Sequence, residues 1–539
     1  MTSFALPLPQ TKHLNVPREN QSWLLSPSED RAVGLVASNA KALAAAEIEV
    51  QGCSLSCLRT RTRYAVLNAA RRYTMAAGAD IGGTDRTADL KNWVVGGHQP
   101  ALFHPGVWAK NFAMAHMASR IGAVSLNLVV DNDAMASSSI RVPTGSLENP
   151  QAVDIPFDIP QSKQPWENVK VQDVNLFRAF PQRVREAMRA WNFAPLLETF
   201  WPRVLEFHDS TPRLADAFTA ARNQQERKWG AANLELPLSH LCQLPPFLWF
   251  ACHILAHLPR FREIYNRAVR DYRRANHIHS TSHPVPELTQ LGEWLEAPFW
   301  VWRKGESRRS RLFVQQRGPV LVLAKEAGEV LVELPLTADS HAQIAVERLQ
   351  ELETQGISIR TRALTTTLFS RTCLADLFIH GIGGAKYDEI TDQLISQFFH
   401  LPVPAYWVVT GTLYLPLETQ AVTADDLTRY KRRIWDLQWN PATALADVAD
   451  QRVQDLCADF HELLRQPAPD RAARRARHRK LSEIKAELSK WAIVKLPEAQ
   501  AQITQATRQL AANRVLQNRD YASVLHPEQS LKDFLQAGH

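Results

Sequence analysis

Two apolar segments, separated by a glycine-bounded loop and a helical stretch, constrain the fold of this chain most strongly. Residues 93–95 form a short apolar run before Gly96-Gly97, and residues 107–121 have the pattern of a helix. Residues 124–130 are a second apolar run, which ends in Asp131-Asn132-Asp133. A strand, a helix and a strand in this order predict a parallel pair with a right-handed crossover. The sequence therefore predicts an α/β fold with a parallel-sheet core.

The polar turns after these two strands are the first candidate site. Ligands of open α/β sheets bind beyond the carboxyl ends of the strands, and loop 97–106 and turn 131–133 both occupy such ends. We expect His98, Asp131 and Asp133 to be catalytic. The histidine could polarise a carbonyl or shuttle a proton, and the carboxylates could orient or deprotonate an amine.

The same loop predicts an anion-binding surface. Gly97 allows close backbone approach, and the helix after Gly106 offers free N–H groups to a phosphate or carboxylate. We expect a substrate or nucleotide to contact Gly97, Gln99, His104 and Lys110. Each of these residues taken alone could be a turn former or a cap, but their convergence at one edge favours a site. We assign no metal site.

A second glycine cluster, at residues 381–384, is the other candidate. It follows the apolar run 374–379 and precedes a helix predicted over 388–399. The GxxxxGK[ST] spacing of a P-loop is absent, but glycines that open a helix suit an anion. We expect Gly383, Gly384 and Lys386 to contact the ligand, with Arg362 adding positive charge.

The tail of the chain is predicted to be helical. One helix is expected over residues 471–495 and a second from Pro497 to residue 518, as an antiparallel hairpin or a short coiled coil. The expected segments are N-terminal helices (1–90), the first part of the core (91–160), a helical insertion (161–290), a mixed α/β insertion (291–355), the second part of the core (356–450) and the helical tail (451–539).

Composition narrows the setting. The six cysteines form no CxxC pair, residues 1–19 lack a signal-peptide pattern, and no segment has the ~20 apolar residues that span a bilayer. We therefore expect a cytoplasmic protein without a membrane partner. The charge of +7, from 62 basic and 55 acidic residues, is mild for 539 residues. The basic run at 471–480 could bind nucleic acid, but a solvated helix face or a contact between subunits is favoured.

Two stretches resemble the bacillithiol biosynthesis cysteine-adding enzymes. The first is Val94-Val95-Gly96-Gly97-His98-Gln99-Pro100-Ala101-Leu102-Phe103 with Gly106, Lys110 and the acidic turn 131–133, and the second runs from Arg362 to Gly383-Gly384-Ala385-Lys386-Tyr387. The chain departs from the family pattern at three places. His98 stands where the family has a glutamine, and no histidine follows Asp133. Ala385 and Lys386 stand at or near the positions where the family has a proline and a glutamate. The resemblance is that of a divergent member.

The resemblance implies a Rossmann-like (nucleotidyltransferase-like) core with helical insertions and a dimerising coiled coil over 471–518. It also implies an adenine-nucleotide-sized pocket, with ATP or ADP as the candidate cofactor and Tyr387 among the binding residues. We expect a ligase-like enzyme that joins a carboxylate, such as that of an amino acid, to an amine in a small-molecule thiol or related pathway. The alternative is a non-catalytic small-molecule-binding or scaffold relative, in which His98, Lys110 and Asp133 are paired internally and face no cavity.

Overall fold

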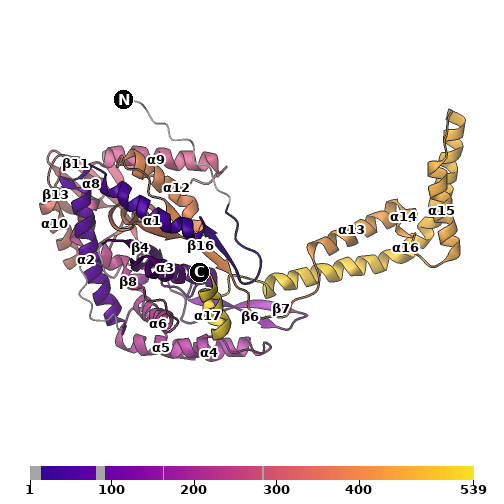
Figure 1. Cartoon of the computed structure of the whole chain (residues 1–539), viewed down its shortest axis with the longest axis horizontal. Coiled ribbons are helices and arrows are strands. Elements are labelled where there is room, and N and C mark those ends of the chain that lie inside the picture. The colour runs from indigo at the N-terminus through magenta and orange to yellow at the C-terminus, as the bar shows by residue number, and fades with distance from the viewer. Residues whose placement is uncertain (1–13, 80–90, 162, 282–284, 539) are drawn as a thin grey trace.

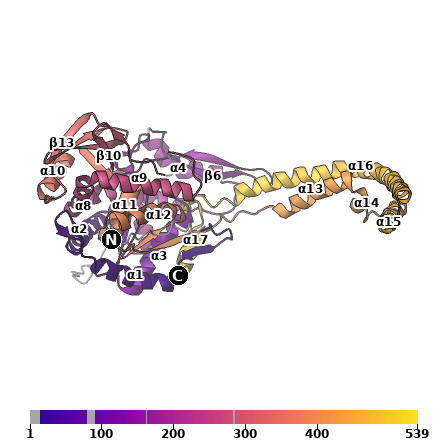
Figure 2. The ribbon, with the colours of Figure 1, turned by 90° about the horizontal axis from the view of Figure 1, so that it is seen from above.

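The chain folds into a body with a long helical arm (Figure 1). The structure is a computed structural model that describes residues 14–79, 91–161, 163–281 and 285–538. The end of the expected N-terminal segment, residues 80–90, lies outside these described residues. The arm projects away from the body in both views (Figures 1 and 2).

A six-stranded sheet forms the centre of the body. Its order is β1-β16-β15-β4-β5-β8; β1 runs antiparallel to β16, and every other neighbouring pair is parallel. The predicted α/β class with a mostly parallel sheet is therefore confirmed. The strands are β1 (Ser22–Ser26), β4 (Trp93–His98), β5 (Val124–Val129), β8 (Leu234–Pro237), β15 (Leu377–His380) and β16 (Tyr406–Thr412).

The predicted strand–helix–strand unit is present. β4 and β5 pair in parallel along their whole lengths, from Trp93 opposite Val124 to His98 opposite Val129, and α3 (Pro105–Ile121) connects them. Gly122 ends α3 in the left-handed conformation that favours glycine. Loop 99–104 and turn 131–133 therefore leave neighbouring strands at the same edge of the sheet.

The helix that follows the second glycine cluster begins earlier than the predicted start at residue 388, within the cluster itself. β15 ends at His380, and α12 (Ile382–Gln397) begins two residues later, so Gly383 and Gly384 lie in the first turn of a helix. Glycine has a low helix propensity, which favoured a later start. Its position at the start of the helix still leaves free backbone N–H groups at the edge of the sheet.

Helices cover both faces of the sheet because successive strand side chains point to opposite sides. Val95 packs with α2 (Leu55–Ala76), whereas Val94 packs with α1 (Glu29–Ala44) and α3.

β8 falls within the segment 161–290 that is expected to be a helical insertion, yet it is the sixth strand of the core sheet. The other elements of this part of the body include the hairpins β2 (Glu49–Val50)–β3 (Cys53–Ser54) and β6 (Ser139–Gly145)–β7 (Pro150–Pro156), and the helices α4 (Val174–Ala187), α5 (Leu197–Ser210), α6 (Leu214–Lys228), α7 (Leu238–Leu241), α8 (Pro245–Ala256) and α9 (Leu258–Ala275).

A second, antiparallel sheet packs beside the core. Its order is β13-β12-β11-β10-β14, and β9 pairs with β10. β14 is the last of these strands along the chain, and it leads directly into α11 (Ala363–Phe369) at the edge of the core sheet. The other elements are β9 (Gln290–Leu291), β10 (Trp294–Arg303), β11 (Ser310–Arg317), β12 (Val320–Lys325), β13 (Glu329–Pro335), β14 (Ile357–Thr361) and α10 (Gln343–Thr354).

The arm differs from the expected hairpin. α16 (Arg471–Leu516) is one helix of 46 residues that continues through Pro497, so the predicted pairing of 471–495 with 497–518 is wrong. A proline inside a helix removes one hydrogen bond and bends the axis, and α16 is bent between its two straight parts (Figure 1). α16 packs instead against preceding helices, which are α13 (Ala424–Trp439), α14 (Pro441–Ala444) and α15 (Gln451–Arg465).

After the arm, the chain returns to the body. The backbone N–H and the hydroxyl of Ser523 both donate to the carbonyl of Phe103, each over 2.8 Å. The short helix Ser523–Leu525 and α17 (Glu528–Ala537) then pack into the apolar cluster that contains Trp108 of α3. Among the described residues, no helix combines the length and apolar character needed to cross a membrane.

Candidate functional site

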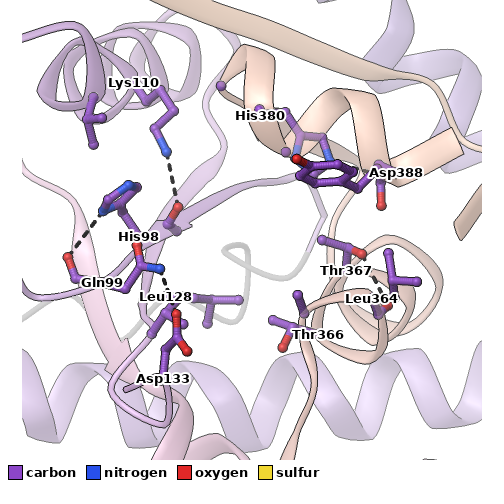
Figure 3. A pocket seen from close by; sticks show the side chains of 18 of the residues that line it. His98, Gln99, Lys110, Leu128, Asp133, Leu364, Thr366, Thr367, His380 and Asp388 are labelled. Carbon is purple, nitrogen blue, oxygen red and sulfur yellow. Dashed lines mark hydrogen bonds and ion pairs between the residues drawn. The ribbon is translucent and has the colours of Figure 1, made fainter. Parts of the chain in front are cut away.

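A cavity of about 700 Å³ lies at the carboxyl edge of the core sheet, where β4, β5 and β15 end. The N-termini of α3, α11 and α12 contribute to its wall. Figure 3 shows His98, Gln99, Lys110 and Asp133 on one side, and His380 and Asp388 on the other. The expected site residues that line the cavity are Gly97, His98, Gln99, His104, Lys110, Asp133, Arg362, Gly383, Gly384 and Tyr387.

Two expected site residues do not line this cavity. Asp131 is buried, and its carboxylate accepts hydrogen bonds from the backbone N–H of Ser239 (2.9 Å) and from the Ser239 hydroxyl. Burial, with the nearby Glu167 carboxylate, raises the pKa of Asp131 to about 7. Lys386 is exposed and lines a different cavity, together with Glu389.

His98 ends β4 beside a cation rather than an acid. Its Nδ1 lies 3.3 Å from the carbonyl oxygen of Gln99, and its ring meets the Phe103 ring edge-on. Burial, together with the charge of Lys110, lowers the pKa of His98 to about 3. The imidazole is therefore neutral at pH 7, so it can polarise a ligand through a hydrogen bond but supplies no charge.

Lys110 is the buried cation of this wall. Its side chain is 6% exposed, and Nζ donates to the carbonyl of Gly97 over 3.1 Å. Burial lowers the pKa of Lys110 to about 8, so most of the population is still charged at pH 7. An ammonium has three donors, and the Gly97 carbonyl takes one of them. The others are available to an anion in the cavity.

His104 and Asp133 already have protein partners. Nδ1 of His104 accepts from the backbone N–H of Gly106 over 3.1 Å, which makes this histidine the cap of α3. Burial, and then the charge of Arg519, lower the pKa of His104 to about 4. The Asp133 carboxylate accepts from Gln99 Nε2 (2.9 Å) and from Arg309 Nη1 (3.0 Å). Both residues thus fix the conformation of the loops at the carboxyl edge of the sheet, and both also line the cavity.

An aromatic and cationic wall closes the side of the second sheet. The guanidinium carbon of Arg362 lies 4.2 Å from the centre of the Trp300 ring, and that of Arg309 lies 4.9 Å from the same ring. Arg362 also forms a 2.7 Å ion pair with Glu296. Its Nε is buried, with no hydrogen-bond partner among the described residues. The guanidinium of Arg362 is therefore held beside the cavity both by the ion pair with Glu296 and by stacking on Trp300.

A histidine–carboxylate–guanidinium chain forms the opposite wall, and sequence reasoning missed it. Nε2 of His380, at the end of β15, lies 2.8 Å from Oδ2 of Asp388 on α12. Arg371 Nη1 donates to the same Oδ2 over 2.5 Å. Burial alone would raise the pKa of Asp388, but Arg371 and His380 hold it well below its ordinary value. The only signal in the sequence was a histidine that ends an apolar run just before the glycines.

The cavity carries an excess of positive charge. Among the described residues that line it, Lys110, Arg309, Arg362 and Arg519 face two carboxylates, Asp133 and Asp388. The N-termini of two long helices, α3 and α12, add their positive ends. In the described part of the chain, no cluster of three histidine, cysteine or acidic side chains could hold a metal ion. The cavity therefore favours an anionic organic ligand.

No protein-family model matches the sequence, and no curated protein matches it.

Proposed function

We propose that the cavity binds an anionic small molecule of nucleotide size and that the protein is a ligase-like enzyme. It would join a carboxylate, such as that of an amino acid, to an amine in a small-molecule thiol or related pathway, as the resemblance to the bacillithiol biosynthesis enzymes implies. The observation that carries the proposal is the meeting of buried Lys110 with the N-termini of α3 and α12 in one cavity of about 700 Å³. Drug-sized and cofactor ligands occupy cavities of roughly this size, about 300–1,000 Å³.

The donor set supports ATP or ADP as the nucleotide. The spare donors of Lys110 and the free N–H groups at the start of α12 suit phosphate oxygens, and Arg362 suits a second anionic group. ATP, when bound, would supply the phosphoryl group that activates a carboxylate. In this proposal Lys110 stabilises the charge that develops on the leaving group, neutral His98 polarises the carbonyl, and Asp133 orients the amine.

The geometry favours an enzyme over the non-catalytic alternative. That alternative requires His98, Lys110 and Asp133 to be paired internally and to face no cavity. All three have protein partners, but all three also line the cavity (Figure 3). The mostly parallel sheet with its ligand edge fits the Rossmann-like core that we propose, and the six unpaired cysteines fit a cytoplasmic location.

Calorimetric titration with ATP and ADP, with and without Mg²⁺, tests the proposal. We expect binding, and we expect Lys110→Met to weaken it by about tenfold or more, because a hydrogen bond to a charged group contributes about 1.5–3 kcal/mol. The matched control is Lys170→Met, which removes an exposed lysine that does not line the cavity. Absence of nucleotide binding, or an equal loss of affinity in both variants, would contradict the proposal.

We also propose that the arm pairs with the arm of a second copy. Trp435, Trp439, Trp491, Ile493 and Val494 are exposed on α13 and α16, which project beyond the reach of the body (Figure 2). Large apolar side chains that are exposed on a projecting element favour an interface, and two-fold pairing of identical chains is the commonest solution.

Light scattering after gel filtration tests this pairing. We expect a dimer for the wild type and a monomer for Trp491→Glu combined with Val494→Glu. The control is Tyr64→Glu, at an exposed aromatic residue of α2 on the body. A wild-type monomer would contradict the pairing, and salt-sensitive binding of nucleic acid by such a monomer would assign the arm to the basic run at 471–480 instead.

A further inference from the structure

His380 stands at the end of the strand next to the one that ends in His98. β15 and β4 pair in parallel, and the register of Ile379 opposite Gly96 places His380 beside Gly97. The His380 side chain is 5% exposed, and its ring packs against the rings of Phe378 and Tyr406 at 4.6 and 4.9 Å between centres. The imidazole is thus held rigidly at the wall of the cavity.

The Asp388 carboxylate decides which nitrogen of His380 carries the hydrogen. Arg371 and His380 hold the pKa of Asp388 well below its ordinary value, although burial opposes them, so the group is ionised. An ionised carboxylate can only accept a hydrogen bond, so Nε2 of His380, 2.8 Å away, must be the donor. In the neutral imidazole, Nδ1 therefore keeps its lone pair.

Arg371 fixes the carboxylate in turn. It is 2% exposed, lies in the π-helical turn Ser370–Leu374, and contacts Asp388 (2.5 Å), Asp392 (2.7 Å) and the ring of Tyr406 (5.0 Å to the centre). π-helical turns are rare in proteins, and those that occur are often found at functional sites. The chain from Arg371 through Asp388 to His380 therefore has little freedom to move.

Gly384 leaves the space that Nδ1 of His380 needs. A Cβ atom at position 384 would lie 2.9 Å from this nitrogen, whereas a Cβ at position 383 would meet nothing within 4 Å. Both glycines are in the first turn of α12 and both line the cavity. No hydrogen bond joins Nδ1 to any described residue, and His380 is among the residues that line the cavity.

We propose that His380 is the proton acceptor of this site, acting through Nδ1, with Asp388 and Arg371 as positioning residues. The inference rests on the proposed function, in which an amine attacks an activated carboxylate. The amine nitrogen forms the new C–N bond, and the bond from the carbonyl carbon to the phosphate leaving group breaks. The leaving group takes that electron pair, and the proton of the amine passes to Nδ1. The resulting imidazolium is stabilised by Asp388.

Acylation by diethyl pyrocarbonate, read by mass spectrometry of the His380 peptide, tests the inference without knowledge of the substrate. The reagent reacts with a nitrogen that keeps its lone pair, so we expect His380 to be modified in the native full-length protein. Gly384→Ala should slow the modification by about tenfold or more, because the new Cβ covers Nδ1, whereas Gly383→Ala should not. Asp388→Asn should slow it as well, because the amide can reverse the tautomer.

Two outcomes would overturn the assignment. One is an unreactive His380 in a protein whose His98 peptide is modified, and the other is equal rates in Gly384→Ala and Gly383→Ala. Position 384 is exposed, and alanine favours a helix more than glycine does, so we expect Gly384→Ala to fold. This variant therefore tests the inference even if Asp388→Asn does not fold. Nucleotide calorimetry separates the two proposals. A reactive His380 in a protein that binds no nucleotide contradicts the proposed function, whereas an unreactive His380 in a protein that binds it contradicts this inference alone.

Discussion

Two walls of the cavity are built in the same way, and their difference shows how neighbouring residues set the chemistry of a histidine. In each wall a core strand ends in a histidine and leads into a helix whose N-terminus faces the cavity. The residue that this helix places at the cavity differs. It is Lys110 on α3, in the wall of His98, and Asp388 on α12, in the wall of His380.

The two walls therefore carry opposite charges beside their histidines. Burial and the charge of Lys110 lower the pKa of His98 to about 3 and keep it neutral, so Lys110 is the cation of this wall and favours negative charge in the cavity. Asp388 binds Nε2 of His380, so a proton arriving at that ring is compensated by a fixed carboxylate. One fold element, used twice in adjacent strands, thus produces one wall suited to an anion and one suited to a proton.

The largest expected effect is on stability. Asp388→Ala leaves the guanidinium of Arg371, which is 2% exposed, with Asp392 as its remaining ion-pair partner. Removing one member of a buried pair destabilises a fold by about 3–5 kcal/mol, and we expect a decrease of that order in the free energy of unfolding. Chemical denaturation monitored by tryptophan fluorescence measures it.

The matched substitution on the other wall is Lys110→Met. Lys110 is buried without a carboxylate partner among the described residues, and burial already lowers its pKa to about 8. A methionine of similar length should therefore change the free energy of unfolding by less than about 1.5 kcal/mol. Equal destabilisation by the two substitutions would show that the walls do not differ in the way described.

The next largest difference is expected between alanine substitutions at the N-termini of the two helices, α3 and α12. A Cβ at Gly106 of α3 would lie 2.9 Å from Thr410 Oγ1, and closer still to the Gly411 carbonyl and the Arg519 guanidinium. Gly106→Ala should therefore destabilise the protein by about 1–3 kcal/mol through overpacking. Gly383→Ala, which meets nothing within 4 Å, should stabilise α12 by up to about 1 kcal/mol. Thermal unfolding compares them, and a neutral Gly106→Ala would contradict the tight fit of α3.

The anion wall should respond to alkaline pH. Burial lowers the pKa of Lys110 to about 8, so the ammonium loses its proton as the pH rises through that value. Affinity for ADP should fall by about tenfold between about pH 7 and pH 9 as the charge disappears. Lys110→Met should show no such step in calorimetric titration. A step of the same size in the variant would assign the pH dependence to another group.

The smallest effect concerns His98 in mild acid. Its folded-state pKa of about 3 lies below the ordinary value of 6.5, so the unfolded chain takes up the proton first. Stability is therefore lost as the pH falls below about 6.5, and His98 should contribute a loss of less than about 1 kcal/mol between about pH 7 and pH 6. Urea denaturation at the two pH values, with His98→Asn as the reference, measures it. If His98→Asn loses as much stability between the two pH values as the wild type does, the loss belongs to other groups.

Sequence patterns were sufficient for the wall that contains His98. Two apolar strands, a helix with a proline and glycine start, and polar turns at the strand ends are local features, and the structure has all of them. The direction of a side chain was not predictable in the same way. Asp131 occupies the expected edge, but its carboxylate turns to Ser239, more than a hundred residues away along the chain.

The wall that contains His380 was less visible because its interactions span different elements. His380 and Asp388 are eight residues apart across a strand end and a helix, a spacing that matches no common pattern, and Arg371 comes from a π-helical turn. β8 is only four residues long and ends in a proline, so it was absorbed into the helical region. Pro497 predicted a break, but Leu488, Ala492 and Ala499 of α16, on both sides of the proline, pack against α13, α14 and α15, and these contacts support a continuous helix.

The arm leaves and re-enters the body at one point. Gln420, just before α13, exchanges hydrogen bonds of 2.8 and 2.9 Å with Asn513, near the end of α16. The arm is therefore an excursion from a closed circuit rather than a tail. Excising it and bridging the two ends by a few residues would leave the circuit intact. Arg519 would still be in place, since this cavity residue is supplied by the chain only after the excursion has ended.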